Sequence, residues 1–319
     1  MKNYAIWPKS KFRIREYLKF NLYFLTSSRL EKRLEKMFPS GYAVLCSSGR
    51  AAINMALVYK KHSRPDFVGV NSYTSHCVLD SISRVATPII WNFKPQSNTK
   101  TRLIYHQWGY IQKDVSQINN IDDCVDTLCE IGTKLFPTSQ DFEIWSFPKI
   151  LGTTSGAVLW CKKESVAKEI RVMRDLRGGG FFLWALRNLG FLNKNIYWLW
   201  QGLEAQKGRP SAPEIKEINN EINKWEQRIY DRKKKLNLIW EFAPKWLKKT
   251  KGRIPTVVPL EYDLYKNNTI FKKLQFEIKH LEKYQKLNSS SLIKVFPIPI
   301  HEDVSFEFIY KLKKHLKMN

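Results

Sequence analysis

The sequence of 319 residues predicts an α/β fold with a mainly parallel sheet, followed by a smaller α+β region. Two observations support this prediction. Short apolar runs alternate with segments of helical spacing over residues 41–163, which is typical of parallel strands joined by crossover helices. Beyond Pro210 and Pro213 the pattern changes to a long polar helix and then to a few strands and helices. We therefore expect a large domain over residues 1–205 and a smaller C-terminal domain over residues 206–319.

The composition is that of a folded and strongly basic protein. Hydrophobic residues make up 43% of the chain, which is enough for a sizeable core and excludes a disordered class. The formal net charge of +25 fits nucleic acid, an anionic membrane surface or phosphorylated substrates as partners. No zinc-finger, RNA-recognition or helix-turn-helix signature accompanies the charge. We therefore expect no nucleic-acid binding and interpret the basic residues mainly as solvated helix faces.

Membrane signals and cysteine spacing both bear on the cellular compartment. No apolar run reaches the ~20 residues that a bilayer span requires, and the N-terminus shows no signal peptide. The five cysteines show no paired spacing and lie mostly in apolar runs, so we expect buried, reduced thiols and no metal site. These observations predict a cytoplasmic protein.

The first half of the chain alternates between helical and strand patterns. Residues 1–40 have a basic, helical pattern, and residues 41–46 form a short apolar strand. Ser48 and Gly49 then precede a helix over residues 50–60. A helix that begins there directs its backbone N–H groups and its dipole at an anion. An ordinary N-cap by Ser48 explains the same residues, and both interpretations stay open.

Further strands of the sheet follow along this half. They are expected over residues 67–70, 87–91, 103–106 and 121–125, with a helix between residues 73 and 85 and a crossover over residues 111–121. Ligands of such sheets bind outside the carboxyl ends of the strands. Ser48, Tyr73 and Asp123 fall at such ends. This coincidence predicts a ligand site at one edge of the sheet.

One lysine is prominent in the segment WSFPKILGTTSGAVLW, residues 145–160. We interpret this segment as a strand, a tight turn that carries Lys149, and a second strand, with Gly152 and Gly156 allowing the backbone to turn. An apolar floor beneath Lys149 would keep it from bulk water, disfavour its charged form and make the amine a nucleophile towards an aldehyde. Lys149 also falls at the end of a predicted strand, as Ser48, Tyr73 and Asp123 do.

The second half of the chain is less regular. A basic segment over residues 171–180 precedes an aromatic segment over residues 181–200. We interpret the aromatic segment as a helix pair buried at a subunit interface, and a membrane-surface helix is the alternative. A long polar helix is expected over residues 214–242. The C-terminal pattern predicts strands over residues 256–260 and 292–300, and helices over residues 270–284 and from residue 305.

The residues at the strand ends are of the types that hold pyridoxal phosphate (PLP). A lysine forms the Schiff base with the aldehyde, a carboxylate pairs with the pyridine nitrogen, a helix N-terminus takes the phosphate, and an aromatic side chain stacks on the ring. Lys149, Asp123, the start of the helix at Ser48, and Tyr73 supply these four parts. The sequence therefore predicts PLP as the cofactor.

From about residue 41 to the C-terminus, the sequence resembles the DegT/StrS-type aminotransferases, which act on keto sugars linked to nucleotides. The motifs occur in the family's order: CSSGRAAINMAL as the phosphate loop, NSYTSHCVLDSISRVATPII with the stacking aromatic, LIYHQWGY as the His-x-x-Gly turn, IDDCVD as the acidic motif, SFPKILGTTSGAV with the lysine, and FPIPIHEDVSFEFI as the closing strand and helix. The resemblance implies an aspartate-aminotransferase-like fold (PLP transferase fold type I). It also implies a homodimer whose active sites are shared across the interface.

The resemblance implies a role for each candidate residue. Lys149 would be the catalytic residue that forms the Schiff base and moves a proton, and Asp123 would pair with the pyridine nitrogen. The other implied cofactor-binding residues are Ser48, Gly49, Arg50 and Ser146 at the phosphate, Tyr73 on the ring, and Asp126 near the phenolic oxygen.

Two residues depart from the family's pattern. Arg50 stands where Thr is usual, and its guanidinium is able to pair with the phosphate. Asp126 stands where Gln or His is common, and an anion there would repel the phenolic oxygen unless it turns away.

The expected function is a PLP-dependent aminotransferase. It would transfer an amino group from an amino acid, glutamate being the expected donor, to a nucleotide-linked keto sugar for surface polysaccharide or amino-sugar biosynthesis. The first alternative is a divergent, catalytically impaired member that acts as a binding or regulatory protein. The second is a basic protein that binds nucleic acid or a membrane surface.

Overall fold

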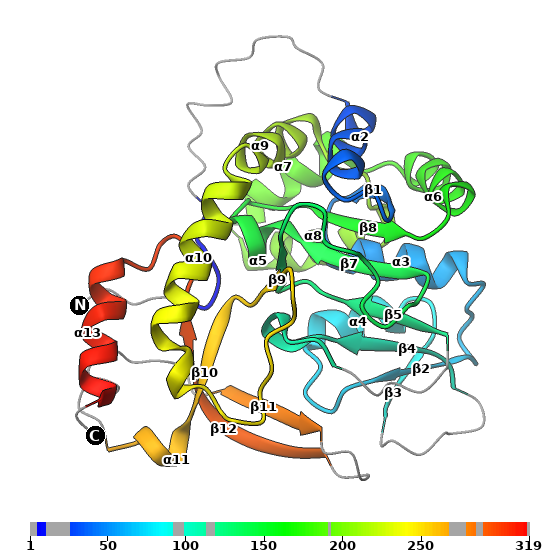
Figure 1. The fold of residues 1–319 in the computed structure, drawn as a ribbon. Helices are drawn as coiled ribbons and strands as arrows, with labels where there is room; N and C mark the ends of the chain where they lie inside the picture. Colours follow the sequence, from blue (N-terminus) through cyan, green and yellow to red (C-terminus); the bar gives the residue numbers. More distant parts are fainter. Residues whose placement is uncertain are drawn as a thin grey trace.

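The structure is a computed structural model that describes residues 5–10, 26–91, 99–112, 119–190, 193–267, 279–284 and 290–317. A seven-stranded sheet of order β1-β8-β7-β5-β4-β2-β3 lies at its centre (Figure 1). Its strands are β1 (Tyr42–Cys46), β2 (Phe67–Val70), β3 (Thr87–Ile90), β4 (Thr99–Tyr105), β5 (Asn120–Asp123), β7 (Phe142–Ser146) and β8 (Ala157–Cys161). Neighbouring strands are parallel except at β8, which runs antiparallel to both β1 and β7. The predicted mainly parallel sheet is confirmed.

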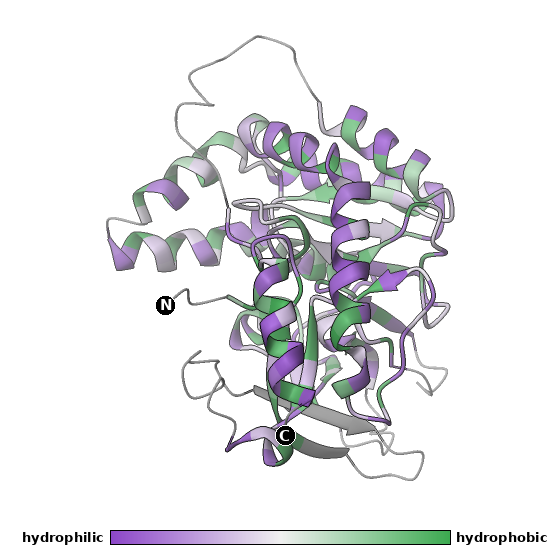
Figure 2. Ribbon diagram, turned by 60° about the vertical axis from the view of Figure 1, so that its left-hand side comes forward, coloured by the Kyte–Doolittle hydropathy of each residue, from purple (hydrophilic) through white to green (hydrophobic). Residues whose placement is uncertain are grey.

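Helices cover both faces of this sheet. They include α2 (Ser27–Met37), α3 (Gly49–Tyr59), α4 (His76–Ser83), α5 (Phe147–Leu151), α6 (Glu164–Arg177) and α9 (Ala212–Ile222). In β1, Val44 and Cys46 pack in a core cluster with α3, α4 and α6, whereas Ala43 and Leu45 pack in a second cluster with α2, α5 and α9. Successive side chains of a strand point to opposite faces, so apolar residues at every position require cover on both sides. The helices accordingly carry hydrophobic and hydrophilic residues on different sides (Figure 2).

Large aromatic side chains fill the cluster beside α2. Phe38 packs edge-on against Trp145 of β7 and Trp160 of β8, with ring centroids 4.9 and 5.8 Å apart. Trp225, at the start of α10 (Trp225–Ile239), stacks on Trp145 at 6.1 Å and donates its Nε1–H to the Cys129 carbonyl. These contacts fix β7, the strand that leads into Lys149.

The C-terminal residues form a separate antiparallel sheet of order β10-β12-β11. Its strands are β10 (Val257–Glu261), β11 (Lys279–Tyr284) and β12 (Ser290–Pro299), and the helices nearby are α10, α11 (Tyr262–Tyr265) and α13 (Phe306–Lys317). Side chains of α10, β10, β12 and α13 share one apolar cluster, and Figure 1 shows these elements together beside the large sheet. The division of the chain at residues 205 and 206 stays a prediction.

The long helix predicted over residues 214–242 is wrong as a single element. The chain turns after Ile222, and α9 and α10 are separate helices, followed by the 3₁₀ turn η2 (Trp240–Phe242). The break lets Ile218 and Ile222 pack on the large sheet while Ile239 packs in the C-terminal cluster. Polar composition alone does not reveal such a change of packing partner.

Two other expected helices are also corrected. Residues 279–284 form strand β11, which pairs with β12 over Ser290–Val295, so strand pairing decides their structure; residues 270–278 of the predicted helix lie outside the described residues. Within the helical pattern expected over residues 1–40, only α2 is a described helix. Residues 5–10 are not helical and contain Pro8, and residues 1–4 and 11–25 lie outside the described part.

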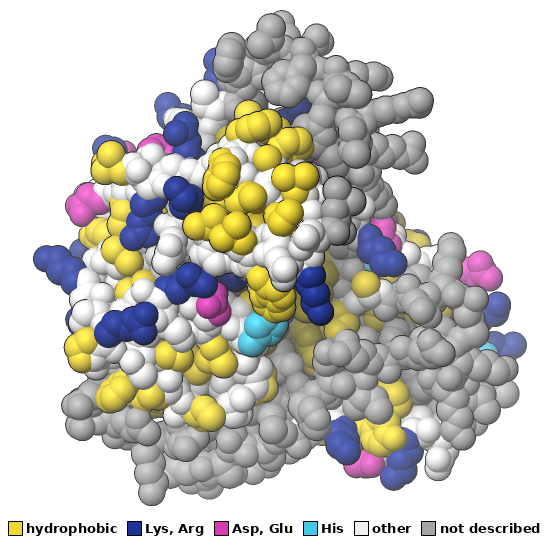
Figure 3. Space-filling model, turned by 180° about the vertical axis from the view of Figure 1, so that it is seen from behind, with side chains coloured by type: hydrophobic (Ala, Val, Ile, Leu, Met, Phe, Trp, Pro, Cys, Tyr) yellow, Lys and Arg dark blue, Asp and Glu magenta, His cyan; other side chains and the backbone are white. Residues whose placement is uncertain are grey.

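The aromatic segment forms the expected helix pair, α7 (Gly180–Gly190) and α8 (Lys194–Lys207). Hydrophobic side chains gather on the rear of the molecule, where this pair lies (Figure 3). The exposed members in and before the pair are Val172, Leu176, Phe181, Phe182, Leu189, Tyr197, Trp198 and Leu199. Among the described residues, no helix is both long and apolar enough to cross a membrane.

The cysteines are free thiols, as expected from their spacing. Cys46, Cys124, Cys129 and Cys161 are buried, and burial raises the pKa of Cys46 and of Cys129 to about 12. Cys77 on α4 is half-buried, so the prediction of buried thiols holds for the other four.

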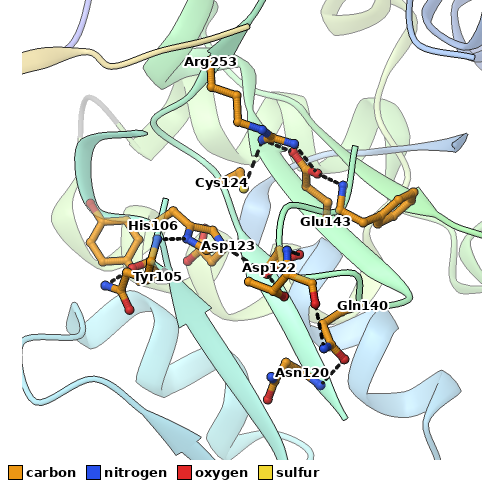
Figure 4. Close-up of polar contacts among 12 residues, drawn as sticks. Tyr105, His106, Asn120, Asp122, Asp123, Cys124, Gln140, Glu143 and Arg253 are labelled. Atoms are coloured by element: carbon orange, nitrogen blue, oxygen red, sulfur yellow. Dashed lines mark hydrogen bonds and ion pairs between the residues drawn. The ribbon is translucent and has the colours of Figure 1, made fainter. Parts of the chain in front are cut away.

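A buried ion pair joins the two-stranded sheet of β6 (Leu128–Cys129) and β9 (Arg253–Ile254) to the large sheet. Arg253 donates from Nη1 and Nη2 to the two carboxylate oxygens of Glu143 on β7, at 2.7 and 2.9 Å. Glu143 also accepts from the Trp145 indole at 2.6 Å and from the Phe136 N–H at 2.5 Å. Both carboxylate oxygens of this buried acid therefore have hydrogen-bond donors (Figure 4).

Arg253→Ala is expected to lower the free energy of unfolding by about 3–5 kcal/mol, because it leaves the Glu143 carboxylate buried without its cation. Urea denaturation at pH 7.5 measures this change. Lys233→Ala is the control, since Lys233 forms a partly exposed pair with Glu130 and its loss should cost less than about 1 kcal/mol. Equal denaturation midpoints for the two variants would contradict the structural role of Arg253.

Candidate active site

The carboxyl ends of β4, β5 and β7 place polar residues at one edge of the large sheet. Tyr105 ends β4, Asp123 ends β5, and Ser146 ends β7. The parallel pairing brings Tyr105 opposite Asp123 and Asp123 opposite Ile144. The short helix α5 begins directly after Ser146 and carries Lys149. The predicted tight turn at Lys149 is therefore a helix of five residues, which begins at Phe147, has Pro148 in its first turn and is capped by Gly152.

Lys149 lies at this edge with its side chain still 31% exposed. Its Nζ is 3.5 Å from Asp126 Oδ1 and 4.8 Å from the centre of the Trp7 ring. The Tyr105 ring centre is 5.8 Å from the same nitrogen. The expectation that an apolar floor keeps Lys149 from solvent is wrong, because one side of the amine faces a carboxylate and another side faces water. The amine is therefore accessible to a ligand that enters from the edge.

Asp126 is a fully buried carboxylate with several donors. Oδ1 accepts from Trp7 Nε1 at 2.8 Å, and Oδ2 accepts from the Tyr105 hydroxyl and, at 3.3 Å, from the Trp108 N–H. With Lys149 at 3.5 Å, these contacts compensate the buried charge. The carboxylate is turned towards these donors. It therefore turns away from the place expected for the phenolic oxygen, as is required if the two are not to repel each other.

Asp123 is the other buried acid at the edge. Its Oδ1 accepts from the Val125 N–H at 3.3 Å. Burial raises the pKa of Asp123 to about 6, although Lys149 acts in the opposite direction. The Asp123 carbonyl accepts from the His106 N–H at 2.9 Å, which ties β5 to the end of β4. Asp123 is therefore a buried carboxyl group with a raised pKa that lies within electrostatic range of Lys149.

The neighbouring acid, Asp122, has a different environment (Figure 4). It is fully buried and accepts from the Thr138 hydroxyl at 2.6 Å. His106 Nδ1 accepts from the Gln112 N–H at 3.1 Å, so Nε2 carries the proton and donates to Asp122 Oδ1, also at 3.1 Å. Asp122 thus connects β4 and β5 within the fold, and Asp123 is the member of the acidic motif at the edge.

The start of α3 lies at the same edge. The Ser48 hydroxyl accepts from the Ala51 N–H at 3.2 Å, so the N-cap interpretation is confirmed. The Arg50 guanidinium forms an ion pair with buried Glu204 of α8 and lies 5.2 Å from the Trp200 ring centre. Glu204 therefore already neutralises the cation that the sequence suggested for a phosphate.

The last two predicted residues, Tyr73 and Ser146, flank this group. The Tyr73 hydroxyl accepts from Gln112 Nε2 at 3.3 Å, and its ring centre is 6.1 Å from that of Tyr105. Ser146 is the N-cap of α5, and its side chain makes no cap hydrogen bond. The structure therefore brings Tyr73 near Lys149 through Tyr105 and places Ser146 at the end of β7.

Sequence reasoning missed Tyr105 and Trp7. Tyr105 had a usable signal, because it is an aromatic residue at the end of a predicted strand. Trp7 had none, because it reaches Asp126 from a part of the chain 119 residues away. Both residues bind Asp126, the position where the sequence departs from the family's pattern.

The arrangement at this edge fits PLP. Lys149 offers a partly exposed amine, and Asp123 offers a carboxylate next to it. A Cβ at Gly49 would come within 3.6 Å of Val125 Cγ1, so the glycine keeps open the space between α3 and the loop after β5. The buried Ser47 hydroxyl, just before α3, has no hydrogen-bond partner among the described residues. An anion at the start of α3 would supply one.

Comparison with known proteins shows the family of the chain. A family model described as "Putative PLP-dependent aminotransferase" matches residues 30–309. A search of curated proteins found no match.

Solved structures of aminotransferases share the fold of this chain. The PLP form of the putative sugar aminotransferase Spr1654 from Streptococcus pneumoniae is 14% identical, with a TM-score of 0.66 over 99% of this chain and 98% of that one. A DegT DnrJ EryC1 StrS aminotransferase from Brucella abortus is 14% identical, with a TM-score of 0.63 over 95% and 93%. DesI, solved in the presence of its TDP-sugar product, is 13% identical, with a TM-score of 0.61 over 92% and 84%. These likenesses confirm the predicted fold type I architecture, and the family model confirms the predicted PLP-dependent aminotransferase.

Asp123→Asn is expected to remove part of the pH dependence of stability in the cofactor-free protein. Because the pKa of Asp123 in the folded protein, about 6, lies above the ordinary aspartate pKa of 3.8, the native chain loses stability as the pH rises from about 4 to about 6. The asparagine variant should lack this loss and gain about 3 kcal/mol relative to the native chain at pH 8. Denaturant unfolding at pH 4, 6 and 8 measures the difference.

Asp122→Asn is the matched control for this prediction. It alters the contacts to His106 and Thr138, so it should destabilise the protein at pH 8. If Asp123→Asn left the pH profile unchanged, the assigned environment of Asp123 would be incorrect.

Proposed function

Because this chain belongs to the family of PLP-dependent aminotransferases, we propose that it transfers the amino group of an amino acid, with glutamate as the donor, to a nucleotide-linked keto sugar. PLP is the cofactor of the family. When bound, PLP supplies an electron sink for negative charge at the reacting carbon. The observation that carries the proposal is the grouping of Lys149 and Asp123 at one edge of the sheet, beside the start of α3.

The proposed roles follow from where each side chain lies. Lys149 binds the cofactor and moves a proton with Nζ, which is partly exposed and 3.5 Å from Asp126. Asp123 pairs with the pyridine nitrogen from its buried position. Asp126 accepts three hydrogen bonds and positions Lys149; it does not contact the phenolic oxygen of the cofactor in this proposal.

The phosphate is proposed to bind at the start of α3. Ser48 holds the first turn as its cap, and Gly49 and Arg50 lie in that first turn, where backbone N–H groups have no acceptor within the helix. Ser146 adds a hydroxyl from the end of β7, and Tyr73 stacks on the cofactor ring. The guanidinium of Arg50 acts through its pair with Glu204, which keeps the helix start in place.

The substrate class is proposed on chemical grounds. A formal net charge of +25 favours a substrate that carries a diphosphate. DesI, which has the same fold, was solved with a TDP-sugar product. Synthesis of surface polysaccharides or amino sugars in the cytoplasm is the setting we propose.

A homodimer is part of the proposal. The exposed apolar side chains of the α7–α8 pair form a surface that a second copy of the chain would cover. The α8 end of that pair contacts Arg50 through Glu204 and Trp200, so a partner there would adjoin the proposed phosphate site. The alternative of an impaired, non-catalytic member has no observation that favours it.

Lys149→Arg tests the proposal, because it keeps a cation beside Asp126 but cannot bind PLP covalently. The native protein with PLP should show a visible absorption band that survives dialysis and changes when glutamate is added. The variant should lack the band and lose amino transfer by about 10³-fold or more. Lys168→Arg is the control, because Lys168 is an exposed side chain of α6; this variant should behave like the native chain.

The acceptor is tested with the native enzyme. Amino transfer is expected to a nucleotide-linked keto sugar and not to the same keto sugar without its nucleotide. A dialysis-resistant band without transfer to any nucleotide-linked keto sugar would support the impaired-member alternative. Equal transfer to both acceptors would refute the proposed substrate class.

A further inference from the structure

We propose that the N-terminal strap, residues 5–10, is part of the active site and that Trp7 is a positioning residue for Lys149 and Asp126. This inference rests on the proposed function, because it assigns a role around the lysine that the function requires. None of the strap residues was among the candidates that the sequence indicated.

The strap is tied to the fold at three points. The Ala5 carbonyl accepts from His301 Nε2 at 2.9 Å, and the Lys9 N–H donates to Asp303 Oδ2 at 2.8 Å. The Ser10 hydroxyl donates to Glu217 Oε1 of α9 at 3.2 Å. The anchors come from the loop before α13 and from α9, which are far apart in the sequence. Six residues therefore connect two parts of the molecule, and Trp7 lies between the anchors.

His301 has one orientation that suits this task. Its Nδ1 accepts from the Asp303 N–H at 3.3 Å, so Nε2 is the protonated nitrogen that donates to the Ala5 carbonyl. Burial lowers the pKa of His301 to about 4; the cations Arg232 and Lys235 act in the same direction, whereas the hydrogen bond to Ala5 and the charge of Asp303 act against it. The ring is therefore neutral at physiological pH, and the contact with Ala5 persists across that range.

The strap packs directly on the helix that carries Lys149. Gly152 ends α5 with a φ of 68°. A Cβ at Gly152 would lie 3.0 Å from the Lys9 carbonyl oxygen and 3.1 Å from Pro8 Cβ. A left-handed backbone and this close approach both require glycine. The end of α5 and the strap are therefore fitted to each other.

Trp7 makes two contacts at the centre of the site. Its indole N–H donates to Asp126 Oδ1 at 2.8 Å, and the same oxygen is 3.5 Å from Lys149 Nζ. The face of its ring is 4.8 Å from that nitrogen, within range of a cation–π interaction. Lys149 thus lies between the Asp126 carboxylate and the face of the Trp7 ring. Trp7 also binds that carboxylate through its N–H.

The exposure of Trp7 distinguishes this role from simple packing. The side chain is 37% exposed, although its N–H reaches a fully buried carboxylate. A tryptophan that only anchored the strap would gain more by burying its ring in the core. The ring instead lies against one side of the partly exposed amine. The geometry therefore makes Trp7 a wall of the active site that also fixes Asp126.

The experiment measures the reactivity of Lys149 in the cofactor-free protein. Acetic anhydride at pH 8 acetylates free amines, and mass spectrometry of the peptides gives the rate at Lys149 relative to exposed Lys168. Trp7→Ala removes the ring and the N–H and should raise the relative rate by about threefold or more. Trp7→Phe keeps a ring but frees Asp126 Oδ1 to hold Lys149, so its rate should equal or fall below that of the native chain.

Two further variants complete the test. Asp303→Ala removes the anchor of Lys9 without changing Trp7 and should raise the rate at Lys149 less than Trp7→Ala does. Tyr230→Ala removes an exposed aromatic side chain of α10, outside the proposed site and dimer surface, and should leave the rate unchanged. Circular dichroism confirms that each variant is folded.

A raised rate in Trp7→Ala together with an unchanged or lowered rate in Trp7→Phe would support the positioning role, because loss of folding would raise the rate in both variants. An unchanged rate in Trp7→Ala would overturn the proposal. The absorption band of the native protein with PLP is recorded separately, so a failure of the proposed function is distinguishable from a failure of the strap.

Discussion

A sheet that is covered on both faces leaves only the ends of its strands for chemistry. Alternate residues of β1 pack in two different apolar clusters, and the large aromatic side chains of β7 and β8 fill one of them. Polar groups are therefore excluded from the faces unless they are paired, as Glu143 is by Arg253. At the carboxyl ends of β4, β5 and β7 this restriction ends, and the acids and the lysine gather there. The position of the active site is a consequence of how the core is built.

Three acids that are close in the sequence illustrate how this edge separates structural from functional charge. Asp122 points into the fold and has His106 and Thr138 as partners. Asp123 has a single backbone donor at 3.3 Å, and its pKa is raised to about 6 by burial. Asp126, one turn further along the chain, accepts from Trp7 and Tyr105. The same residue type therefore serves three different purposes within five positions, and the supply of donors decides which.

Local patterns predicted most of the sheet and the centre of the site. The strands around residues 42–46, 67–70 and 142–161 follow from apolar runs, and Lys149 and Asp123 follow from their places after such runs. The failures have one physical cause, which is contact between distant parts of the chain. Strand β11 exists because β12 pairs with it, and Trp7 belongs to the site because Asp126 accepts its N–H. The separate packing partners of α9 and α10 likewise exist only in the folded chain.

The antiparallel strand β8 has a consequence for the order of events during synthesis. In the described sheet, β1 is an edge strand whose only neighbour is β8, with Tyr42 opposite Cys161. The ribosome adds about 5–20 residues per second, so this apolar strand waits for several seconds or more before its partner emerges. During that interval it has unpaired backbone groups and exposed side chains, which is the state that molecular chaperones bind. Completion of the sheet, rather than formation of the first helices, should therefore limit how fast the nascent chain becomes resistant to aggregation.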